Sequence, residues 1–235
     1  GEIGKTREHI LGYYYVQEVT SMMPIIALNP QPGEMILDLC SAPGSKTTQM
    51  AAVMKNEGNI IANDISIGRI RILVANLERC GVTNTIITRH NGIELCDKLK
   101  KLGIKFDKIL VDAPCSGEGN LRGSPRTLLE WSEGLLKNLG SRQKKLLSSA
   151  SDLLKEGGEI VYSTCTYAPE ENEAVVQNLI DGKNFKIVKI NLPLKTRNGV
   201  TEWKENKFSK SLVDAKRIYH HDNDMEGFFV CKLKK

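Results

Sequence analysis

Two cysteines of this sequence stand in short polar turns that follow apolar runs. Cys115 comes directly after Val-Asp-Ala-Pro, and Cys165 lies within Ser-Thr-Cys-Thr. Thiols beside Pro and hydroxyl residues suit nucleophilic or acid–base chemistry, whereas a single cysteine inside an apolar run is more often inert packing. If the two preceding runs form neighbouring strands, both thiols converge on one crevice. The cysteines inside helix-like or strand-like segments are interpreted as packing residues: Cys80, Cys96 and Cys231.

The spacing of the six cysteines argues against a zinc site and against a disulfide framework. They stand at positions 40, 80, 96, 115, 165 and 231, and the sequence contains no CxxC or CxH pair. Zinc sites of the usual kind need such pairs. A chain of 235 residues can build a core without disulfides, and nothing in it suggests export. We therefore expect reduced thiols, a cytoplasmic location and no bound metal.

A turn of small residues follows the first apolar run and leads into a helical segment. It consists of Cys40, Ser41, Ala42, Pro43, Gly44, Ser45 and Lys46. Small side chains let a ligand approach the backbone N–H groups at the start of a helix. A phosphate-cradling loop would need Gly beside Lys and a second Gly five positions upstream, and a dinucleotide loop would need G-x-G-x-x-G. Neither pattern is present.

A nucleoside joined to an amino acid is the third ligand class that this turn could take. Asp64 ends the second apolar run and could offer its carboxylate to a ribose diol, as acids do in related nucleotide-binding folds. Taken alone, Asp64 is explained equally well as a structural acid at a strand end.

The elements around these turns predict an α/β fold. Apolar runs rich in Ile and Val predict buried strands, and amphipathic segments between them predict helices. Their alternation predicts a mostly parallel sheet with helices on both faces, in which the carboxyl ends of the strands line the ligand site. The expected strands span 35–40, 59–64, 84–90, 106–114, 158–166, 185–192 and 227–234, and the expected helices span 13–28, 45–55, 66–80, 128–155 and 169–181.

Two stretches interrupt this alternation. Residues 115–127 form a loop rich in Gly, Ser, Pro and Arg that is long enough to be functional. Residues 193–226 are expected to form an irregular basic insertion. We expect a single catalytic domain over 1–235, with an N-terminal helical region (1–34), a core (35–192), that insertion and a final strand (227–235).

The composition is that of a folded globular chain with an uneven charge. Hydrophobic residues make up 40%, charged residues 26%, and the net charge is +5. Residues 183–235 carry +7 and residues 1–182 carry −2. The basic segment is either a solvated surface or a rim that faces phosphates. The longest apolar stretch, 22–28, contains Pro24 and is far shorter than the ~20 residues of a membrane span, and the charged first ten residues do not form a signal peptide.

Six segments, in order along nearly the whole chain, resemble the NOL1/NOP2/Sun RNA (cytosine-5) methyltransferases. They are YYYVQEVTSMM (13–23), DLCSAPGSKT (38–47), NDISIGRI (63–70), VDAPCSGEGNLR (111–122), STCTYAPEENE (163–173) and EGFF (226–229). The paired Pro-Cys and Thr-Cys motifs are the most specific of these. The resemblance implies a Rossmann-like, seven-stranded methyltransferase sheet and S-adenosylmethionine (SAM) as the methyl donor.

The resemblance also assigns cofactor-binding residues. The turn from Cys40 to Lys46 would hold the amino-acid end of SAM, Asp64 its ribose with Arg69 supporting that acid, and Asp112 would contact donor and target base together. Asn91 stands where the family usually has an Asp near the adenine. Ser41 and Ser45 replace the usual Ala and Gly. Gly123-Ser124 and Arg126 depart from the family's Arg-Arg-x-Pro-Asp run.

For catalysis, the resemblance implies that the Cys165 thiolate adds to C6 of cytosine, which activates C5 for methylation. Asp112 would assist at N3 of the base, and Cys115 would assist removal of the C5 proton. Lys46 would complete its turn, lower a nearby thiol pKa or hold a phosphate. Replacing Cys165 by Ala is expected to abolish methylation, and replacing Cys115 by Ala is expected to trap a protein–RNA adduct.

The implied partner is RNA with an unpaired target base, and transfer RNA is favoured over ribosomal RNA because the chain is compact. Possible backbone contacts are Arg122, Arg126, Lys216 and Arg217. Three alternatives remain open: methylation at an exocyclic nitrogen, an rRNA target, and a non-catalytic RNA-binding or assembly factor. An accessory protein that sets specificity is also not excluded.

Overall fold

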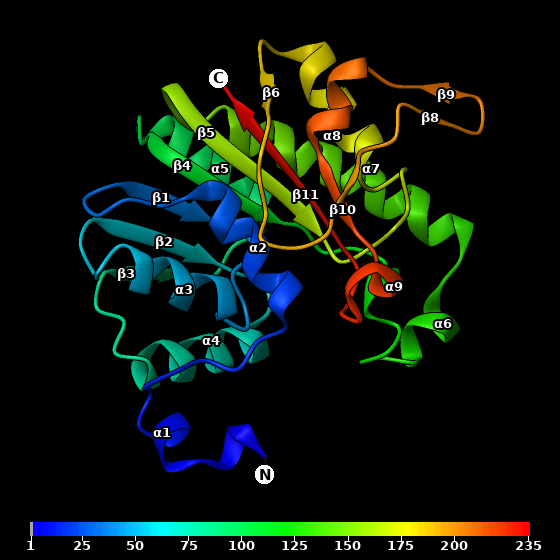
Figure 1. Ribbon diagram of the computed structural model, residues 1–235. Helices are drawn as coiled ribbons and strands as arrows, with labels where there is room; N and C mark the ends of the chain where they lie inside the picture. Colours follow the sequence, from blue (N-terminus) through cyan, green and yellow to red (C-terminus); the bar gives the residue numbers. More distant parts are fainter. Residues whose placement is uncertain (1) are drawn as a thin grey trace.

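A twisted sheet with helices on both faces organises the chain, as seen in the computed structural model, which describes residues 2–235 (Figure 1). Five neighbouring strands are parallel and lie in the order β3-β2-β1-β4-β5, and β11 then joins β5 antiparallel. Their bounds are β1 Met35–Asp38, β2 Asn59–Asn63, β3 Thr85–Thr88, β4 Phe106–Asp112, β5 Leu154–Thr164 and β11 Phe228–Lys234. The α/β class and all of these strands agree with the sequence predictions.

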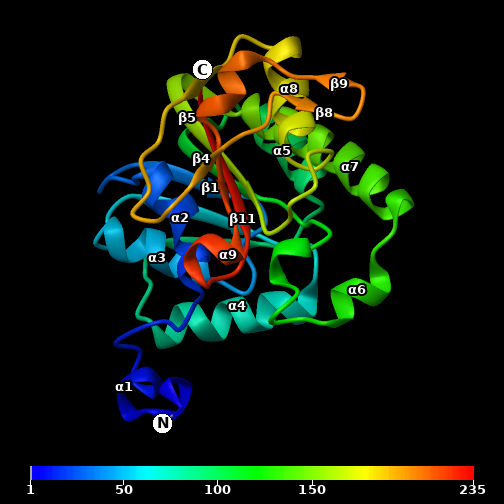
Figure 2. The ribbon, with the colours of Figure 1, turned by 45° about the vertical axis from the view of Figure 1, so that its right-hand side comes forward.

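Three long helices cover each face of the sheet, and the two views in Figures 1 and 2 agree on this. One layer contains α2 Val19–Leu28, α3 Ser45–Val53 and α4 Ile67–Arg79. The other contains α5 Gly92–Lys101, α7 Glu133–Ser151 and α8 Glu173–Gly182. The short helix α1 Arg7–Ile10 lies away from the sheet beside α4, where Arg79 donates to the carbonyl oxygen of His9 (2.7 Å).

Alternating strand residues fill the two cores. Leu37, Ile109 and Tyr162 point to the layer of α5, α7 and α8, whereas Ile36 and Leu110 point to the layer of α2 and α3. This period of two is what a sheet buried on both faces requires. The packed sheet thereby fixes the positions of the loops that follow its strands.

Nine strands join this sheet within residues 2–235, so the predicted number of seven is wrong. The extra strands lie beyond β11, whose free edge is divided between two short partners. β6 Lys186–Val188 pairs with 232–234, and β10 Lys216–Ile218 pairs with 228–230. β7 Arg197–Asn198 then pairs with β10. The segment predicted to be an irregular insertion therefore extends the sheet.

The rest of that segment contains short elements. They are the hairpin of β8 Glu202–Trp203 and β9 Asn206–Lys207, the 3-10 helix η3 Lys210–Asp214 and the helix α9 His220–Asn223. Elsewhere, short elements are the 3-10 helices η1 Ile3–Lys5 and η2 Glu118–Asn120 and the helix α6 Arg126–Glu130. In Figure 1, α6 and α9 both lie at the lower right of the molecule.

Several predicted helix boundaries are corrected. Helix α5 was not predicted, although it buries Leu95 and Leu99 and its first turn is capped by Asn91. The segment 128–155 is divided at Ser132, which caps α7, and its last residues already belong to β5. The helix expected at 169–181 starts at Glu173, and that expected at 13–28 starts at Val19. The residues before those two helices run in turns and extended backbone.

Candidate functional site

The predicted site residues gather at the carboxyl ends of the parallel strands. Cys40 follows β1, Asp64 follows β2, Cys115 follows β4 and Cys165 follows β5. Because β1 lies between β2 and β4, these four turns meet at one edge of the sheet. Ligands bind at this edge in open α/β sheets, where the strand order reverses.

The two cysteine sulfurs are in contact. Cys115 Sγ lies 3.3 Å from Cys165 Sγ, although the residues are 50 positions apart. β4 and β5 pair in parallel with Asp112 opposite Ser163. Cys115 and Cys165 follow these two residues closely, so they lie beside each other at the same end of the two strands. The predicted convergence of the two thiols is therefore observed.

The contact between the sulfurs makes the two thiols chemically unequal. A hydrogen bond from the Cys115 thiol lowers the pKa of Cys165, against the opposing effect of burial. The same hydrogen bond, together with burial, raises the pKa of Cys115 well above its usual value. Because the thiolate is the nucleophilic form of a thiol, Cys165 is the better nucleophile of the pair.

A lysine–aspartate pair lies next to this thiol. Lys46 Nζ lies 2.8 Å from an oxygen of Asp112, whose other oxygen accepts a hydrogen bond from Ser163 Oγ (2.7 Å). Lys46 also donates to Ser21 Oγ (2.8 Å) and lies 5.2 Å from the centre of the Phe228 ring. The charge of Lys46 favours the Cys165 thiolate and the charge of Asp112 opposes it.

A largely apolar cavity opens beside the turn after β2, with about 640 Å³ of empty space. Asp64, which is 3% exposed, accepts from the backbone N–H of Ser66 (2.9 Å) and lies 3.4 Å from a guanidinium nitrogen of Arg69. Arg69 also donates to the carbonyl oxygen of Ala42. Apolar walls of the cavity come from Leu39, Ile65, Ile93, Pro114, Leu139 and Leu146.

Asn91 lines the same cavity as the start of α5. Its side-chain oxygen accepts the backbone N–H of Ile93 (3.0 Å), so it caps the helix. An Asn is a preferred residue at this helix position, which accounts for an amide here without any ligand.

The turn from Cys40 to Lys46 separates this cavity from a second one. Cys40 lines both cavities, and the turn from Ser41 to Lys46 lines the second together with Asp112 and Cys165. Ser41 fastens the turn by donating from its N–H and its hydroxyl to the carbonyl oxygen of Asn63 (2.8 and 3.0 Å). The second cavity has about 1100 Å³ of empty space and ends at the nucleophilic thiol.

The two cavities, which Cys40 and Arg69 both line, fit the chemistry of SAM. The apolar cavity offers a carboxylate for a ribose and apolar walls for an adenine. The small-residue turn leads from there to the second cavity, where Asp38 is fully buried and its Oδ1 has no hydrogen-bond partner among residues 2–235. An unpartnered buried carboxylate oxygen is costly unless a ligand donates to it.

Some functional side chains escaped the sequence analysis. Burial raises the pKa of Asp38 to about 7, and Thr47 donates to its other oxygen (2.7 Å). Two acids accept hydrogen bonds in the turns around the cysteines, Glu118 from Thr166 and Glu171 from the backbone N–H of Ser116. A third, Glu173, forms an ion pair with Arg217 of β10. The sequence analysis gave the acids in 170–173 no role at the site, although they follow the Cys165 turn within a few residues.

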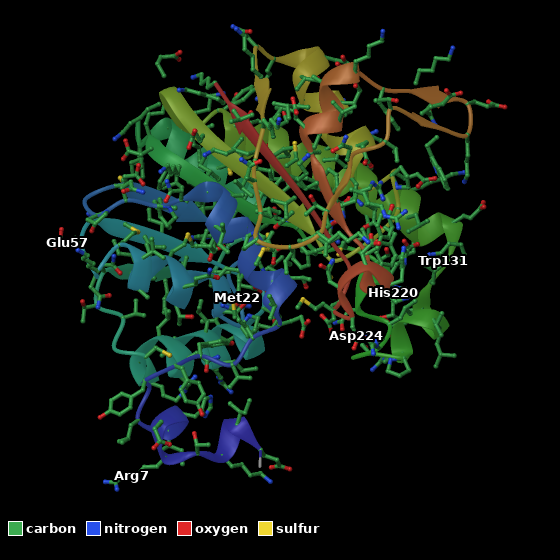
Figure 3. The ribbon with its side chains drawn as sticks, viewed as in Figure 1. Arg7, Met22, Glu57, Trp131, His220 and Asp224 are labelled. Carbon is green, nitrogen blue, oxygen red and sulfur yellow. The ribbon has the colours of Figure 1, made fainter. Side chains whose placement is uncertain are left out.

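The basic residues proposed to contact RNA differ in their surroundings. Arg122 and Arg126 are exposed and lie next to Asp224 (2.7 Å) and Glu130 (2.6 Å). Trp131 and Asp224, with His220, mark this side of the molecule in Figure 3. Lys216 is partly exposed and donates to Asn198 (2.9 Å).

Arg217 is a correction to the sequence analysis, which assigned it to RNA contact. Its side chain is 4% exposed and forms an ion pair with the fully buried Glu173. It also donates to the carbonyl oxygen of Tyr167 (2.9 Å). Alternation along β10 turns Lys216 outward and Arg217 inward, so Arg217 holds the β10 segment to α8.

Within residues 2–235, the His, Cys, Asp and Glu side chains form no group of three or more that could hold a metal ion. Over the same range, every helix is too short or too polar to cross a membrane.

A family model described as "16S rRNA methyltransferase RsmB/F" matches residues 25–234. A curated relative from Pyrococcus abyssi, named tRNA (cytosine(49)-C(5))-methyltransferase, is 44% identical over 99% of this chain and 73% of its own length. A human relative, named 28S rRNA (cytosine(4447)-C(5))-methyltransferase, is 42% identical over 99% of this chain. The crystal structure of NSun6 from Pyrococcus horikoshii with SFG superposes over the whole chain with a TM-score of 0.85 and 32% identity.

The chain is shorter than these proteins. It spans 29% of the human relative and 56% of the NSun6 chain.

Proposed function

The chain belongs to the RsmB/F family of RNA methyltransferases, which confirms the resemblance to the NOL1/NOP2/Sun enzymes, and we propose that it forms 5-methylcytosine in RNA with SAM as the methyl donor. The observation that carries the proposal is the contact of 3.3 Å between Cys115 and Cys165 at the end of a cavity lined by Asp112. The two cavities, which Cys40 and Arg69 both line, fit that donor.

In this proposal, Asp64 with Arg69 holds the ribose of SAM and Asn91 lies near the adenine. The turn from Cys40 through Ser41, Ala42, Pro43, Gly44 and Ser45 to Lys46 holds the amino-acid end. When bound there, SAM supplies an electrophilic methyl group on its sulfonium sulfur. Asp38 lines the second cavity, and its unpartnered oxygen is an acceptor that the sequence analysis did not assign.

The first covalent step belongs to Cys165. Its thiolate forms a bond to C6 of cytosine, the C5–C6 double bond opens, and the electron pair is accommodated as N3 takes up a proton delivered through Asp112. C5 becomes nucleophilic and can accept a methyl group, which the unactivated ring cannot do readily. The lowered pKa of Cys165 supports this role because it increases the fraction of attacking thiolate.

Release of the product belongs to Cys115. A base removes the C5 proton, the electron pair re-forms the C5–C6 double bond, and the C6–S bond to Cys165 breaks. Cys115 lies in contact with the leaving sulfur, so it can assist the removal of the C5 proton. The proton on N3 returns through Asp112, which leaves neutral 5-methylcytosine and the Cys165 thiolate. Lys46 holds Asp112 in place and offsets its charge beside the thiolate.

We propose tRNA as the preferred substrate and rRNA as the alternative. The archaeal relative named for tRNA cytosine 49 is 44% identical to this chain, and the human relative named for 28S rRNA is 42% identical. The slightly higher identity to the tRNA enzyme supports this order. A cytoplasmic location, favoured by six unpaired cysteines, belongs to the same proposal.

Methyl transfer from labelled SAM tests the proposal. Unmodified tRNA and rRNA transcripts are incubated with the wild-type protein, and 5-methylcytosine is located by bisulfite sequencing. We expect label in tRNA, none with Cys165→Ala, and with Cys115→Ala a protein–RNA adduct that survives denaturation.

Each other outcome overturns a defined part. An adduct that accumulates with Cys165→Ala reverses the roles of the thiols. Label in rRNA alone makes rRNA the substrate. SAM binding without transfer to either RNA, or label only on an exocyclic nitrogen, would contradict the proposed reaction and would favour a binding factor or a different methyltransferase, respectively.

A further inference from the structure

Glu118 lies between the loops that carry the two cysteines. It belongs to the loop of Cys115, and its Oε2 accepts hydrogen bonds from Thr166 Oγ1 and from the backbone N–H of Tyr167, both at 3.1 Å. Its Oε1 accepts from Trp131 Nε1 (2.7 Å). One carboxylate thus holds the two residues that follow Cys165 and the Trp131 indole at the end of α6, which Figure 3 labels.

Glu171 makes the reciprocal connection. It belongs to the loop of Cys165, and its Oε2 accepts the backbone N–H of Ser116 (3.0 Å) and Gln143 Nε2 (2.8 Å). Ser116 Oγ also lies 2.8 Å from Thr166 Oγ1. Each cysteine loop therefore sends one carboxylate to the residue or residues that follow the other cysteine.

The backbone at the nucleophile is held by the same loop. The N–H of Gly119 donates to the carbonyl oxygen of Cys165 (2.9 Å), and its own carbonyl accepts the N–H of Gly227 (2.8 Å). A Cβ atom at Gly119 would lie 2.3 Å from the Gly227 oxygen, so only glycine permits this approach. A displacement of Glu118 is consequently transmitted to Cys165 through the adjacent residue.

We propose that Glu118 is a positioning residue that keeps the Cys115 and Cys165 sulfurs in contact and so keeps Cys165 activated. The effect on methylation rests on the proposed function, whereas the effect on the thiol does not. Glu118 itself acts on the nucleophile only through Thr166, Tyr167 and Gly119.

The position requires a carboxylate because three donors converge on it. An amide at residue 118 has a single acceptor oxygen, and its NH₂ group must then face either the Tyr167 N–H or the Trp131 N–H, neither of which can accept a hydrogen bond. At Glu171 the situation differs, because both donors bind Oε2 and Oε1 has no hydrogen-bond partner among the described residues. Gln is therefore disruptive at 118 and tolerable at 171.

The test measures the pH dependence of Cys165 alkylation by iodoacetamide in the full chain, with the modified peptides resolved by mass spectrometry. In Glu118→Gln the midpoint is expected to rise by about one pH unit, which makes alkylation at pH 7 about tenfold slower. The methyl-transfer rate is expected to fall by a similar factor while SAM affinity stays unchanged.

A double variant separates positioning from simple destabilisation. Trp131→Phe removes the indole N–H that the NH₂ group of Gln at residue 118 would otherwise face. Glu118→Gln combined with Trp131→Phe should therefore return the alkylation midpoint toward the wild-type value. Glu118→Asp keeps the charge but withdraws both oxygens by one methylene, so it should behave like Glu118→Gln. Glu133→Gln, at an exposed position, is the matched control that should leave the midpoint unchanged.

Two results would overturn the proposal: a wild-type midpoint in folded Glu118→Gln and Glu118→Asp, or a double variant that recovers nothing. If Glu118→Gln is unfolded by circular dichroism, the double variant and Glu118→Asp still decide. If the wild-type protein methylates no RNA, the alkylation results test the positioning role independently of the reaction.

Discussion

Replacing Arg217 by Met should destabilise the fold rather than weaken RNA binding. The guanidinium is 4% exposed and pairs with Glu173, whose side chain is fully buried. Met fills a similar volume but carries no charge, so the variant would leave the Glu173 carboxylate without its cation. The backbone N–H of Val200 donates to the same carboxylate at 2.9 Å and would be its remaining described partner.

The expected loss follows from the cost of an unpaired buried charge. Removing one partner of a buried ion pair costs about 3–5 kcal/mol in unfolding free energy. For a chain of this size, 1 kcal/mol corresponds to a shift in Tm of roughly 2–4 °C, so Arg217→Met should lower Tm by about 6–20 °C. The carbonyl oxygen of Tyr167 also loses a donor, which places the effect toward the upper part of this range.

A double-mutant cycle measured by urea and thermal unfolding provides the assay. Glu173→Gln removes the charge and keeps an oxygen for the Val200 N–H, so Glu173→Gln combined with Arg217→Met should be at least ~2 kcal/mol more stable than Arg217→Met alone. Lys216→Gln, one residue away and facing outward, is the control and should change stability by less than ~0.5 kcal/mol.

The reasoning would be refuted by an Arg217→Met protein within 1 kcal/mol of the wild type, on the order of the ~1 kcal/mol typical of exposed pairs. It would also be refuted if this variant kept its stability and reduced the salt dependence of RNA binding. That result would restore the RNA contact that the sequence suggested.

Three further predictions concern the cavities and the thiol. Asp64→Ala should weaken SAM binding by about tenfold or more in titration calorimetry, since a hydrogen bond to a charged group contributes about 1.5–3 kcal/mol. Burial raises the pKa of Asp38 from 3.8 to about 7, so the wild type should lose up to about 4 kcal/mol of stability as pH rises from 4 to 7. Urea unfolding of Asp38→Asn, measured at pH 4 and at pH 7, should not show that loss of stability. Lys46→Met should raise, and Asp112→Asn should lower, the pH midpoint of Cys165 alkylation, and shifts of equal sign would contradict the assigned charges.

The strand segments could be predicted from the sequence because burial on both faces produces continuous apolar runs. Helix α5 was not, since its apolar residues 95, 96 and 99 form a short stripe between two strands that dominate the local pattern. The 193–226 segment was interpreted as irregular because two- and three-residue strands carry too few residues to show a period of two. β10 is a strand because it pairs with β11, and β7 is a strand because it pairs with β10.

The chemistry of the site was accessible to the extent that it depends on strand ends. Parallel strands place their carboxyl ends together, so the sequence alone predicted Cys115 and Cys165 in one crevice. Their unequal pKa values could not, because these depend on a sulfur contact between residues 50 positions apart.

The acids 170–173 show the same limit. By composition they resemble the solvated first turn of a helix, and in the fold Glu171 and Glu173 are fully buried against Ser116 and Arg217.

By itself, the sequence determined the α/β class, the turns that carry the chemistry and the family, because periodicity, turn residues and motifs are local properties. Tertiary structure alone decided which groups are paired. Lys46 meets Asp112, Glu118 meets Tyr167, and Arg217 meets Glu173 across separate elements. A charge or donor finds its partner through the packing of the whole sheet, and for Arg217 that packing turned a residue predicted to face phosphates into a buried support of the nucleophile loop.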